Sequence, residues 1–315
     1  MKRYENISEE RDRIEEVIRR YGYAPEHHLG WYLCCPDPGE KNVFIESENG
    51  ALLTIEDTAG ECTVLSEPLA SEDKRADLLI EYIQHAFSNS DIKKIWFELE
   101  APTRKAFLKA LPQEFRANPI NYTLTAPLMD LTEFDLGLPG GHYKSVRKEK
   151  HKFYRSHLVE VQDAKTYENK KGLHQIIDDW KNKRFAHDRA FYARYHNMID
   201  SNFAGMTEAR VFVVDGRPAG INAGWMIPNT HCYYGGVGIH DYSIEDLGRM
   251  LYLEDLVWLK IRGYREIDMG GGEKALTEFK NKFIPKSFYK TFVFSVVKNA
   301  IMLVTNGQRT ESKIS

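Results

Sequence analysis

The densest group of residues that could do chemistry lies toward the C-terminal end of the chain. Asp268 ends a short apolar segment, and Gly270, Gly271 and Gly272 come shortly after it. At the end of a strand, a carboxylate can position or deprotonate an ammonium nucleophile, and glycines let a ligand approach the backbone closely. Lys280 could stabilise a developing oxyanion or bind a phosphate. Alternatively, Asp268 only caps the turn and Lys280 is an ordinary surface residue.

Two phenols and a charged cluster extend this group. Tyr234 and Tyr289 could each donate a proton to a leaving group, although tyrosines belong more often to the core. A cluster of charged residues stands among aromatic ones, and the wall of a pocket for the acceptor is one interpretation of it; its members are Arg184, His187, Asp188, Arg189 and Arg194. Alternating charge is also typical of a solvated helix face, so both interpretations stay open.

The most basic stretch of the chain covers residues 142–155. Its candidate phosphate ligands are Lys144, Arg147 and Lys148, because such side chains neutralise the phosphates of a tRNA or of a nucleotide-like donor. A solvated helix face would carry the same charges. Aromatic residues within the stretch suit packing and base stacking equally well.

Composition limits the classes of protein to consider. The net charge of -3 and the pI of about 6.4 argue against a dedicated nucleic-acid binder. No apolar run is long enough for a transmembrane segment, and the N-terminus shows no secretory signal. Neither the four cysteines nor the histidines have metal-ligand spacing, so we expect no metal. Free thiols in a reducing compartment would place the protein in the cytoplasm.

Alternation and helical spacing predict the elements that must hold these residues. In the first half we expect helices at 7–21, 74–88 and 103–111, with strands at 42–47, 51–57, 62–66 and 94–100. In the second half we expect helices at 172–184, 191–203, 243–262 and 275–283, with strands at 158–162, 209–214, 218–227, 231–237, 266–269 and 288–297. Ser243 would cap the longest helix, with Asp246 completing a capping box.

Both halves therefore share the order strands, helix, strand, helix. This order predicts an α/β (α+β) fold of two similar lobes, each with a mixed, mostly antiparallel central sheet flanked by helices. The predicted domains are residues 1–125 and residues 126–315.

Residues 233–289 contain a characteristic series of motifs. The run Tyr-Tyr-Gly-Gly-Val-Gly begins at Tyr233, Arg-Gly-Tyr-x-x-x-Asp-x-Gly-Gly begins at Arg262, and Phe-Lys-x-x-Phe begins at Phe279. Together they resemble the tandem-GNAT acyltransferases of the Fem-like type and the C-terminal domain of phosphatidylglycerol lysyltransferases. The resemblance implies two GNAT-like lobes. It also implies that an amine attacks an activated carbonyl, either the thioester of coenzyme A or the ester of a charged tRNA.

The same resemblance suggests where a coenzyme would bind. GNAT enzymes place the pyrophosphate of coenzyme A at the N-terminus of the long helix, where free N–H groups and the helix dipole favour an anion. The corresponding residues are Val237, Ser243, Leu247, Gly248 and Arg249. Only Gly248 keeps a small residue of the usual motif, and Glu245 and Asp246 put carboxylates where the pyrophosphate would lie. These acids weaken the case for coenzyme A.

Three functions follow as hypotheses. The first is an N-acyltransferase that uses acyl-coenzyme A and a primary amine on a small molecule, amino acid or peptide. The second uses an aminoacyl-tRNA and a peptide or lipid acceptor. The third is a binding protein that kept the fold and lost the chemistry. In the third case, the strands beside Asp268 need not separate to admit a substrate.

Overall fold

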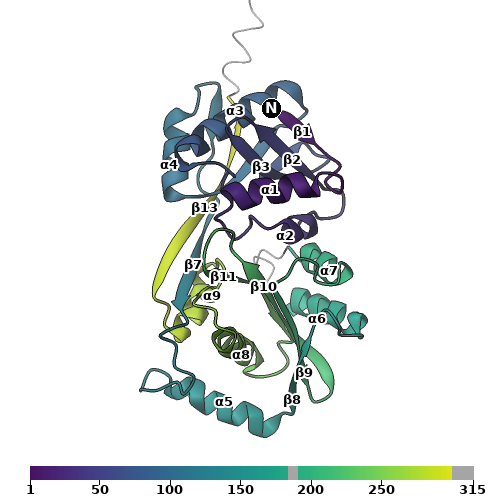
Figure 1. The fold of residues 1–315 in the computed structure, drawn as a ribbon, viewed down its shortest axis with the longest axis vertical. Helices are drawn as coiled ribbons and strands as arrows, with labels where there is room; N and C mark the ends of the chain where they lie inside the picture. Colours follow the sequence, from purple (N-terminus) through teal and green to yellow (C-terminus); the bar gives the residue numbers. More distant parts are fainter. Residues whose placement is uncertain (184–190, 300–315) are drawn as a thin grey trace, which may run out of the picture. The chain divides into compact units, whose positions relative to one another are not determined.

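The computed structural model describes residues 1–183 and 191–299. The chain forms two compact units, each assembled from separate stretches of sequence (Figure 1). Unit 1 combines Met1–Tyr21, Gly39–Leu124 and the described residues 290–299, and unit 2 combines Gly22–Pro38 with the described residues of Thr125–Tyr289. The compact units are therefore not the contiguous ranges 1–125 and 126–315.

Unit 1 consists of a sheet with helices that bury their apolar faces on it. Its strands are β1 (Lys2–Tyr4), β2 (Lys41–Ser47), β3 (Gly50–Glu56), β4 (Glu61–Val64), β5 (Lys94–Glu100), β6 (Phe115–Ala117) and β13 (Ser287–Lys298). Its helices are α1 (Arg11–Tyr21), the short 3-10 helix η1 (Glu72–Lys74), α3 (Arg75–Asn89) and α4 (Ala101–Ala110). The strand order is β1-β2-β3-β4-β5-β13, and β6 pairs with β13.

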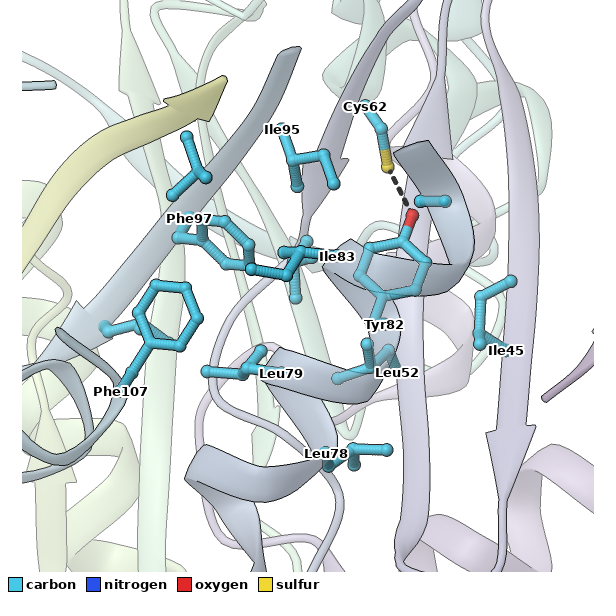
Figure 2. Close-up of a cluster of buried hydrophobic side chains, with 14 of the residues drawn as sticks. Ile45, Leu52, Cys62, Leu78, Leu79, Tyr82, Ile83, Ile95, Phe97 and Phe107 are labelled. Carbon is cyan, nitrogen blue, oxygen red and sulfur yellow. Dashed lines mark hydrogen bonds between the residues drawn. The ribbon is translucent and has the colours of Figure 1, made fainter. Parts of the chain in front are cut away.

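The core of unit 1 forms between α3 and the sheet. Leu78, Leu79, Tyr82 and Ile83 recur at helical spacing on α3, and this apolar face packs with residues of the strands, among them Phe97 (Figure 2). The hydroxyl of Tyr82 lies 2.9 Å from the sulfur of Cys62, so this buried polar group has a partner inside the core. All four cysteines are buried and free, as the sequence predicts.

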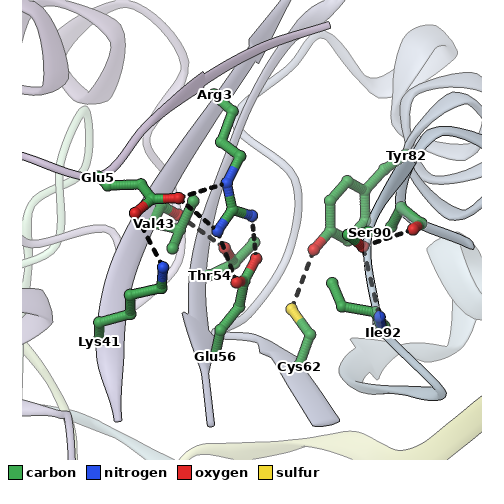
Figure 3. A network of polar contacts seen from close by, with 11 residues as sticks. Arg3, Glu5, Lys41, Val43, Thr54, Glu56, Cys62, Tyr82, Ser90 and Ile92 are labelled. Carbon is green, nitrogen blue, oxygen red and sulfur yellow. Dashed lines mark hydrogen bonds and ion pairs between the residues drawn. The ribbon is translucent and has the colours of Figure 1, made fainter. Parts of the chain in front are cut away.

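A small ionic network attaches the edge strand β1 to the sheet of unit 1 (Figure 3). Arg3 on β1 donates from both terminal nitrogens to Glu56 on β3, one of these bonds being 2.7 Å long, and it also pairs with Glu5. Lys41 reaches the other oxygen of Glu5 at 2.8 Å. Bidentate arginine–carboxylate pairs are geometrically specific, so they fix the register of a strand that is otherwise very short.

Unit 2 is also built of hydrogen-bonded strands covered by helices. Its strands are β7 (Tyr122–Asp130), β8 (Val159–Asp163), β9 (Glu208–Val214), β10 (Arg217–Met226), β11 (Cys232–His240) and β12 (Glu266–Asp268). Its helices are α2 (Leu29–Cys34), α5 (Lys144–Ser156), α6 (Lys170–Lys183), α7 (Ala193–Asp200), α8 (Leu247–Ile261), α9 (Lys274–Lys280) and the 3-10 helix η2 (Asn281–Phe283). The strand order is β7-β12-β11-β10-β9-β8.

The two units repeat one arrangement, as predicted. In unit 1 the parallel pair β4–β5 is joined by α3, and in unit 2 the parallel pair β11–β12 is joined by α8. The other described strand pairs within the two sheets are antiparallel. The predicted fold of two lobes, each with a mixed, mostly antiparallel sheet flanked by helices, is therefore confirmed. No helix in the described ranges is both long and apolar enough to cross a membrane.

The discontinuous units result from an exchange of strands between the two halves of the chain. β13 pairs with β5 of unit 1 from Thr291 to Val296, whereas β7 pairs with β12 of unit 2. The sequence predicts a strand at 288–297, but the partners of both strands lie far away along the chain and leave no local signal. The segment Gly22–Pro38, which contains the unpredicted helix α2, joins unit 2 through contacts between α2 and α7.

Candidate active site

Asp268 lies at the end of β12 with only 1% of its surface exposed. Its Oδ1 accepts a hydrogen bond of 2.8 Å from the backbone N–H of Gly270, and its Oδ2 accepts one of 2.6 Å from the hydroxyl of Tyr289. Burial raises the pKa of Asp268 to about 6, although both hydrogen bonds and the charge of Lys280 oppose this rise. A carboxyl group with such a pKa can exchange a proton near neutral pH.

Lys280 ends α9 and is 98% buried, with 2% of its surface exposed. Its ammonium donates to the carbonyl oxygens of Met269 at 2.6 Å and Gly270 at 2.8 Å. Burial lowers its pKa to about 8, and the nearby charge of Asp268 counteracts this effect. Because an ammonium group has three protons, these two bonds leave one for a further acceptor.

The loop after Asp268 brings the remaining candidates together. Gly270 has a φ of +81°, a conformation that side chains rarely adopt. A Cβ atom there would lie 3.6 Å from the Tyr234 hydroxyl and 3.6 Å from the Lys280 ammonium. Asp268, Lys280, Tyr234 and Tyr289 therefore converge around Gly270, as their sequence motifs suggest. Gly271 is partly exposed beside them.

The pairing of β12 with β11 ends at this group. β12 pairs with β11 only from Cys232 to Tyr234, opposite Glu266 to Asp268, whereas β11 continues to His240 without β12. A register shift in the pairing of β10 with β11, between Ala223 and Trp225, marks the same region of β11. Beyond Tyr234 the edge of β11 is therefore not paired with β12.

An aromatic wall that the sequence does not reveal adjoins Tyr234. The ring of Trp225 lies 5.0 Å from that of Tyr234, 5.3 Å from that of Trp31, and 4.7 Å from the ring of His28, which stacks on it. The indole N–H of Trp225 donates to the carbonyl oxygen of Pro25 at 2.7 Å. The segment Gly22–Pro38 thus supplies part of the surroundings of the site, although it is far from Asp268 in sequence.

The start of α8 differs from the predicted capping box. The helix begins at Leu247, and Asp246 at the cap position has a φ of +65° and makes no capping bond through its side chain. Ser243 instead donates from its N–H and its hydroxyl to Asp241, at 2.8 Å and 2.7 Å. The carboxylate of Asp241 competes successfully for these donors, so the prediction that Ser243 and Asp246 form a capping box was wrong.

The other predicted coenzyme ligands are occupied by contacts within unit 2. Val237 and Leu247 are buried, Leu247 in the apolar core of unit 2. A Cβ atom on Gly248 would lie 2.5 Å from the imidazole of His240, so that ring covers the glycine. Arg249 forms an ion pair with Glu149 of α5. The helix start therefore does not present an open phosphate cradle at these residues.

The basic residues of α5 fall into two groups, those that hold neighbouring parts of the chain and those that are exposed. Arg147 donates to the carbonyl oxygens of Leu138 and Gly140, the latter at 2.9 Å, so it holds the preceding loop. Lys144 and Lys148 are exposed one helical turn apart. The aromatic residues Tyr143 and Phe153 are buried in the core, which leaves them unable to stack on bases. Of the predicted phosphate ligands, Lys144 and Lys148 are thus the two that remain accessible.

Three predicted residues of the acceptor wall, Arg184, His187 and Arg189, lie outside the described residues. Their role stays a prediction. Another arginine of the predicted cluster, Arg194 on α7, is described and lies beside the aromatic wall, 5.4 Å from the ring of Trp31.

Comparisons with known proteins agree with this architecture. The structure is similar to L-PGS from Bacillus licheniformis, with a TM-score of 0.63 and 15% identity over 93% of this chain and 94% of that chain. It is also similar to FemX, with a TM-score of 0.62 and 11% identity over 98% of this chain and 100% of that one. A tandem GNAT protein from the clavulanic acid biosynthesis pathway gives a TM-score of 0.56 and 13% identity over 94% and 98%.

At these identities the solved structures show the fold alone. A comparison with curated protein sequences finds no match. The family described as phosphatidylglycerol lysyltransferase, C-terminal, however, matches residues 19–294, which is most of the chain. The protein therefore belongs to the family of phosphatidylglycerol lysyltransferase C-terminal domains and has the tandem-GNAT fold.

Proposed function

We propose that this protein is an N-acyltransferase that transfers an aminoacyl group from a charged tRNA to a primary amine. The observation that carries the proposal is the buried carboxyl group of Asp268, which is bonded to Tyr289 and Gly270 and accompanied by Lys280 and Tyr234. A buried base with proton donors beside it, at the end of a strand, suits the attack of an amine on an ester carbonyl.

Asp268 would accept the proton that the amine must lose. Both of its oxygens already accept one hydrogen bond, but a carboxylate has room for about four, so an ammonium group can still bind. The proton can pass to Asp268 directly or through the hydroxyl of Tyr289. With its pKa near 6, Asp268 is mostly ionised at neutral pH and remains a usable base.

The remaining groups would act on the carbonyl. The amine nitrogen forms a bond to the carbonyl carbon, and the bond from that carbon to the ester oxygen of the tRNA breaks. Lys280 lies at the Gly270 loop and would stabilise the negative charge that develops on the carbonyl oxygen. The hydroxyl of Tyr234, close to the same loop, would give a proton to the departing ribose oxygen.

The start of α8 favours a tRNA ester over a coenzyme A thioester. Gly248 is covered by His240, and Asp246 takes the cap position, so a pyrophosphate would need both to move. Lys144 and Lys148 on α5 offer accessible charge for RNA phosphates. Many proteins with the GNAT fold use coenzyme A, so acyl-coenzyme A is the alternative donor, and the experiment must compare it with tRNA.

Thermal melting with bulk tRNA, coenzyme A and acetyl-coenzyme A in parallel separates the donors. A ligand present at about 100 times its dissociation constant adds about 2.7 kcal/mol to the free energy of unfolding, which gives a clear shift. We expect a shift with tRNA only, followed by transfer of a labelled amino acid from charged tRNA to an amine. A shift with the coenzymes only would overturn the choice of donor.

A pair of charge reversals provides the control. The double variant Lys144→Glu and Lys148→Glu should weaken tRNA binding at least about tenfold and flatten its dependence on salt by about one unit of slope for each lost phosphate contact. The matched variant Lys105→Glu and Lys109→Glu changes exposed lysines with the same spacing on α4 of unit 1. Equal losses in both double variants would contradict a specific role for α5.

A further inference from the structure

Arg194 on α7 forms no ion pair with a carboxylate of the described residues, although the more distant charge of Asp37 acts on it. Its guanidinium carbon lies 5.4 Å from the ring of Trp31 and 4.5 Å from the ring of Phe191. Its Nε is buried and has no hydrogen-bond partner. Within residues 1–183 and 191–299, no carboxylate forms an ion pair with it.

Such an arrangement is unfavourable for the free protein. Arginine stays charged at any pH that the protein experiences, and although Arg194 as a whole is only partly buried, its Nε is cut off from water. Aromatic faces attract a guanidinium, but they do not supply acceptors for its N–H groups. A buried donor without an acceptor is costly, and functional sites are where such costs are commonly retained.

The position of Arg194 connects it with the candidate active site. Its charge acts electrostatically on the phenol of Tyr234. The ring of Trp31, which the guanidinium contacts, lies 5.3 Å from the ring of Trp225. The ring of Trp225 lies in turn 5.0 Å from the ring of Tyr234. The cation thus lies on the Tyr234 side of the group that includes Asp268, against the aromatic wall.

We propose that Arg194 binds an anionic group, a carboxylate or a phosphate, on the amine acceptor; this inference rests on the proposed function. The site offers complementary charges to one molecule, because the carboxylate of Asp268 suits an ammonium group and Arg194 suits an anion. A guanidinium presents paired N–H groups that match the two oxygens of a carboxylate or phosphate. The acceptor is accordingly an amino acid or another amine that also carries a negative charge.

The acceptor is a better occupant than the donor. The exposed lysines proposed for the donor lie on α5, which packs on α8. Arg194 lies on α7, which contacts α2 and α6 instead. The two sets of cations therefore belong to different parts of unit 2, as expected when two substrates enter separately.

Paired probes test this inference by binding alone. Glycine and O-phosphoethanolamine carry an amine and an anion, whereas methylamine and ethanolamine are their neutral-tailed counterparts. We expect calorimetry and thermal melting to show binding of the first pair, with little response to the second. Arg194→Gln should weaken glycine or phosphoethanolamine binding at least about tenfold, as loss of hydrogen bonds to a charged group implies, and Arg194→Lys should retain part of it. The stronger member of the first pair identifies the anion.

The stability of Arg194→Gln separates binding from a structural role. Because the cation has no acceptor in the described structure, the ligand-free variant should melt at the same temperature as the wild type or higher. Arg104 of unit 1 is a matched control, since it lies 5.1 Å from the ring of Phe294 and its Nε also lacks a partner. Arg104→Gln should leave amine binding unchanged.

Each result has a definite meaning. Equal binding of charged and neutral-tailed amines, or undiminished anionic binding in Arg194→Gln, overturns the inference. If the wild type acylates both kinds of amine equally well, the proposed function stands and the anion site falls. If Arg194-dependent binding is found but no acyl transfer occurs with any donor, the anion site stands and the proposed function falls.

Discussion

The hydroxyl of Tyr289 donates a 2.6 Å hydrogen bond to Oδ2 of Asp268, so the two residues form one proton-exchanging unit. This bond lowers the pKa of Asp268 against the larger effect of burial, which raises it to about 6. Conversely, burial and the negative charge of Asp268 raise the pKa of Tyr289 far above its usual value, so the phenol keeps its proton. The carboxyl group is therefore the member that titrates.

Replacing Tyr289 by phenylalanine removes the bond that favours the ionised carboxylate. We expect the pKa of Asp268 to rise further and kcat/KM at neutral pH to fall at least about tenfold. The acidic limb of the pH profile of kcat/KM should move to higher pH in Tyr289→Phe. Tyr143→Phe is the control, because it removes a hydroxyl that bonds to the carbonyl of Phe283 at 3.1 Å without touching Asp268. If the pH profile of kcat/KM shifts equally in both variants, Tyr289 and Asp268 do not exchange protons as a pair.

Asp268→Asn should uncouple activity from stability. The pKa of Asp268 is raised from 3.8 to about 6 in the folded protein, so its contribution to stability is present at low pH and is lost as the pH rises through 6. The difference in unfolding free energy, variant minus wild type, should therefore be more positive at pH 7.5 than at pH 4.5. Acyl transfer should fall by about 100-fold or more. Denaturant unfolding at both pH values measures the first effect, and a pH-independent difference would refute it.

Lys280→Met keeps the length of the side chain but removes its charge. The carbonyl oxygens of Met269 and Gly270 would lose their donor, which we expect to cost about 2 kcal/mol of unfolding free energy. Loss of the nearby cation should also raise the pKa of Asp268 and move the acidic limb of the activity profile upward. Lys280→Arg tests the charge separately. If Lys280→Met changes stability but leaves both the rate and the pH profile intact, the lysine only holds the loop.

His28 should make the stability of unit 2 depend on acid. Its Nδ1 accepts from the N–H of Trp31 at 3.0 Å at the start of α2, and its Nε2 lies 3.0 Å from the carbonyl oxygen of Gly205. Burial lowers its pKa from 6.5 to about 4. The unfolded chain therefore binds the proton first, and stability is lost as the pH falls from 6.5 toward 4.

Two substitutions at His28 check this account. His28→Ala should cost about 1 kcal/mol through the lost cap, whereas His28→Asn, which can still cap the helix, should recover part of that loss. Neither variant should retain the contribution of His28 to the pH dependence, as followed by thermal melting between pH 4 and 7. An unchanged pH dependence in both would show that other groups cause it.

The sequence was most informative where chemistry and secondary structure coincide. The motifs around Asp268, Gly270 and Lys280 carry their spacing in local sequence, so their convergence at a strand end could be predicted. Arg194, Trp31 and Trp225 could not be grouped in advance, because their proximity depends on packing between distant segments. The prediction for the start of α8 was wrong for a local reason, because Asp241 accepts the hydrogen bonds that Ser243 donates. Helix-capping preferences do not indicate which of several nearby carboxylates will accept these hydrogen bonds.

The exchange of strands has a consequence for synthesis of the protein. β5 emerges from the ribosome long before β13, its partner from Thr291 to Val296. Throughout that interval the nascent chain presents an open strand edge, which can recruit foreign strands. β12, in contrast, finds β7 already translated. Unit 1 is therefore begun early but completed only once β13 has been made, and its dependence on chaperones should last until then.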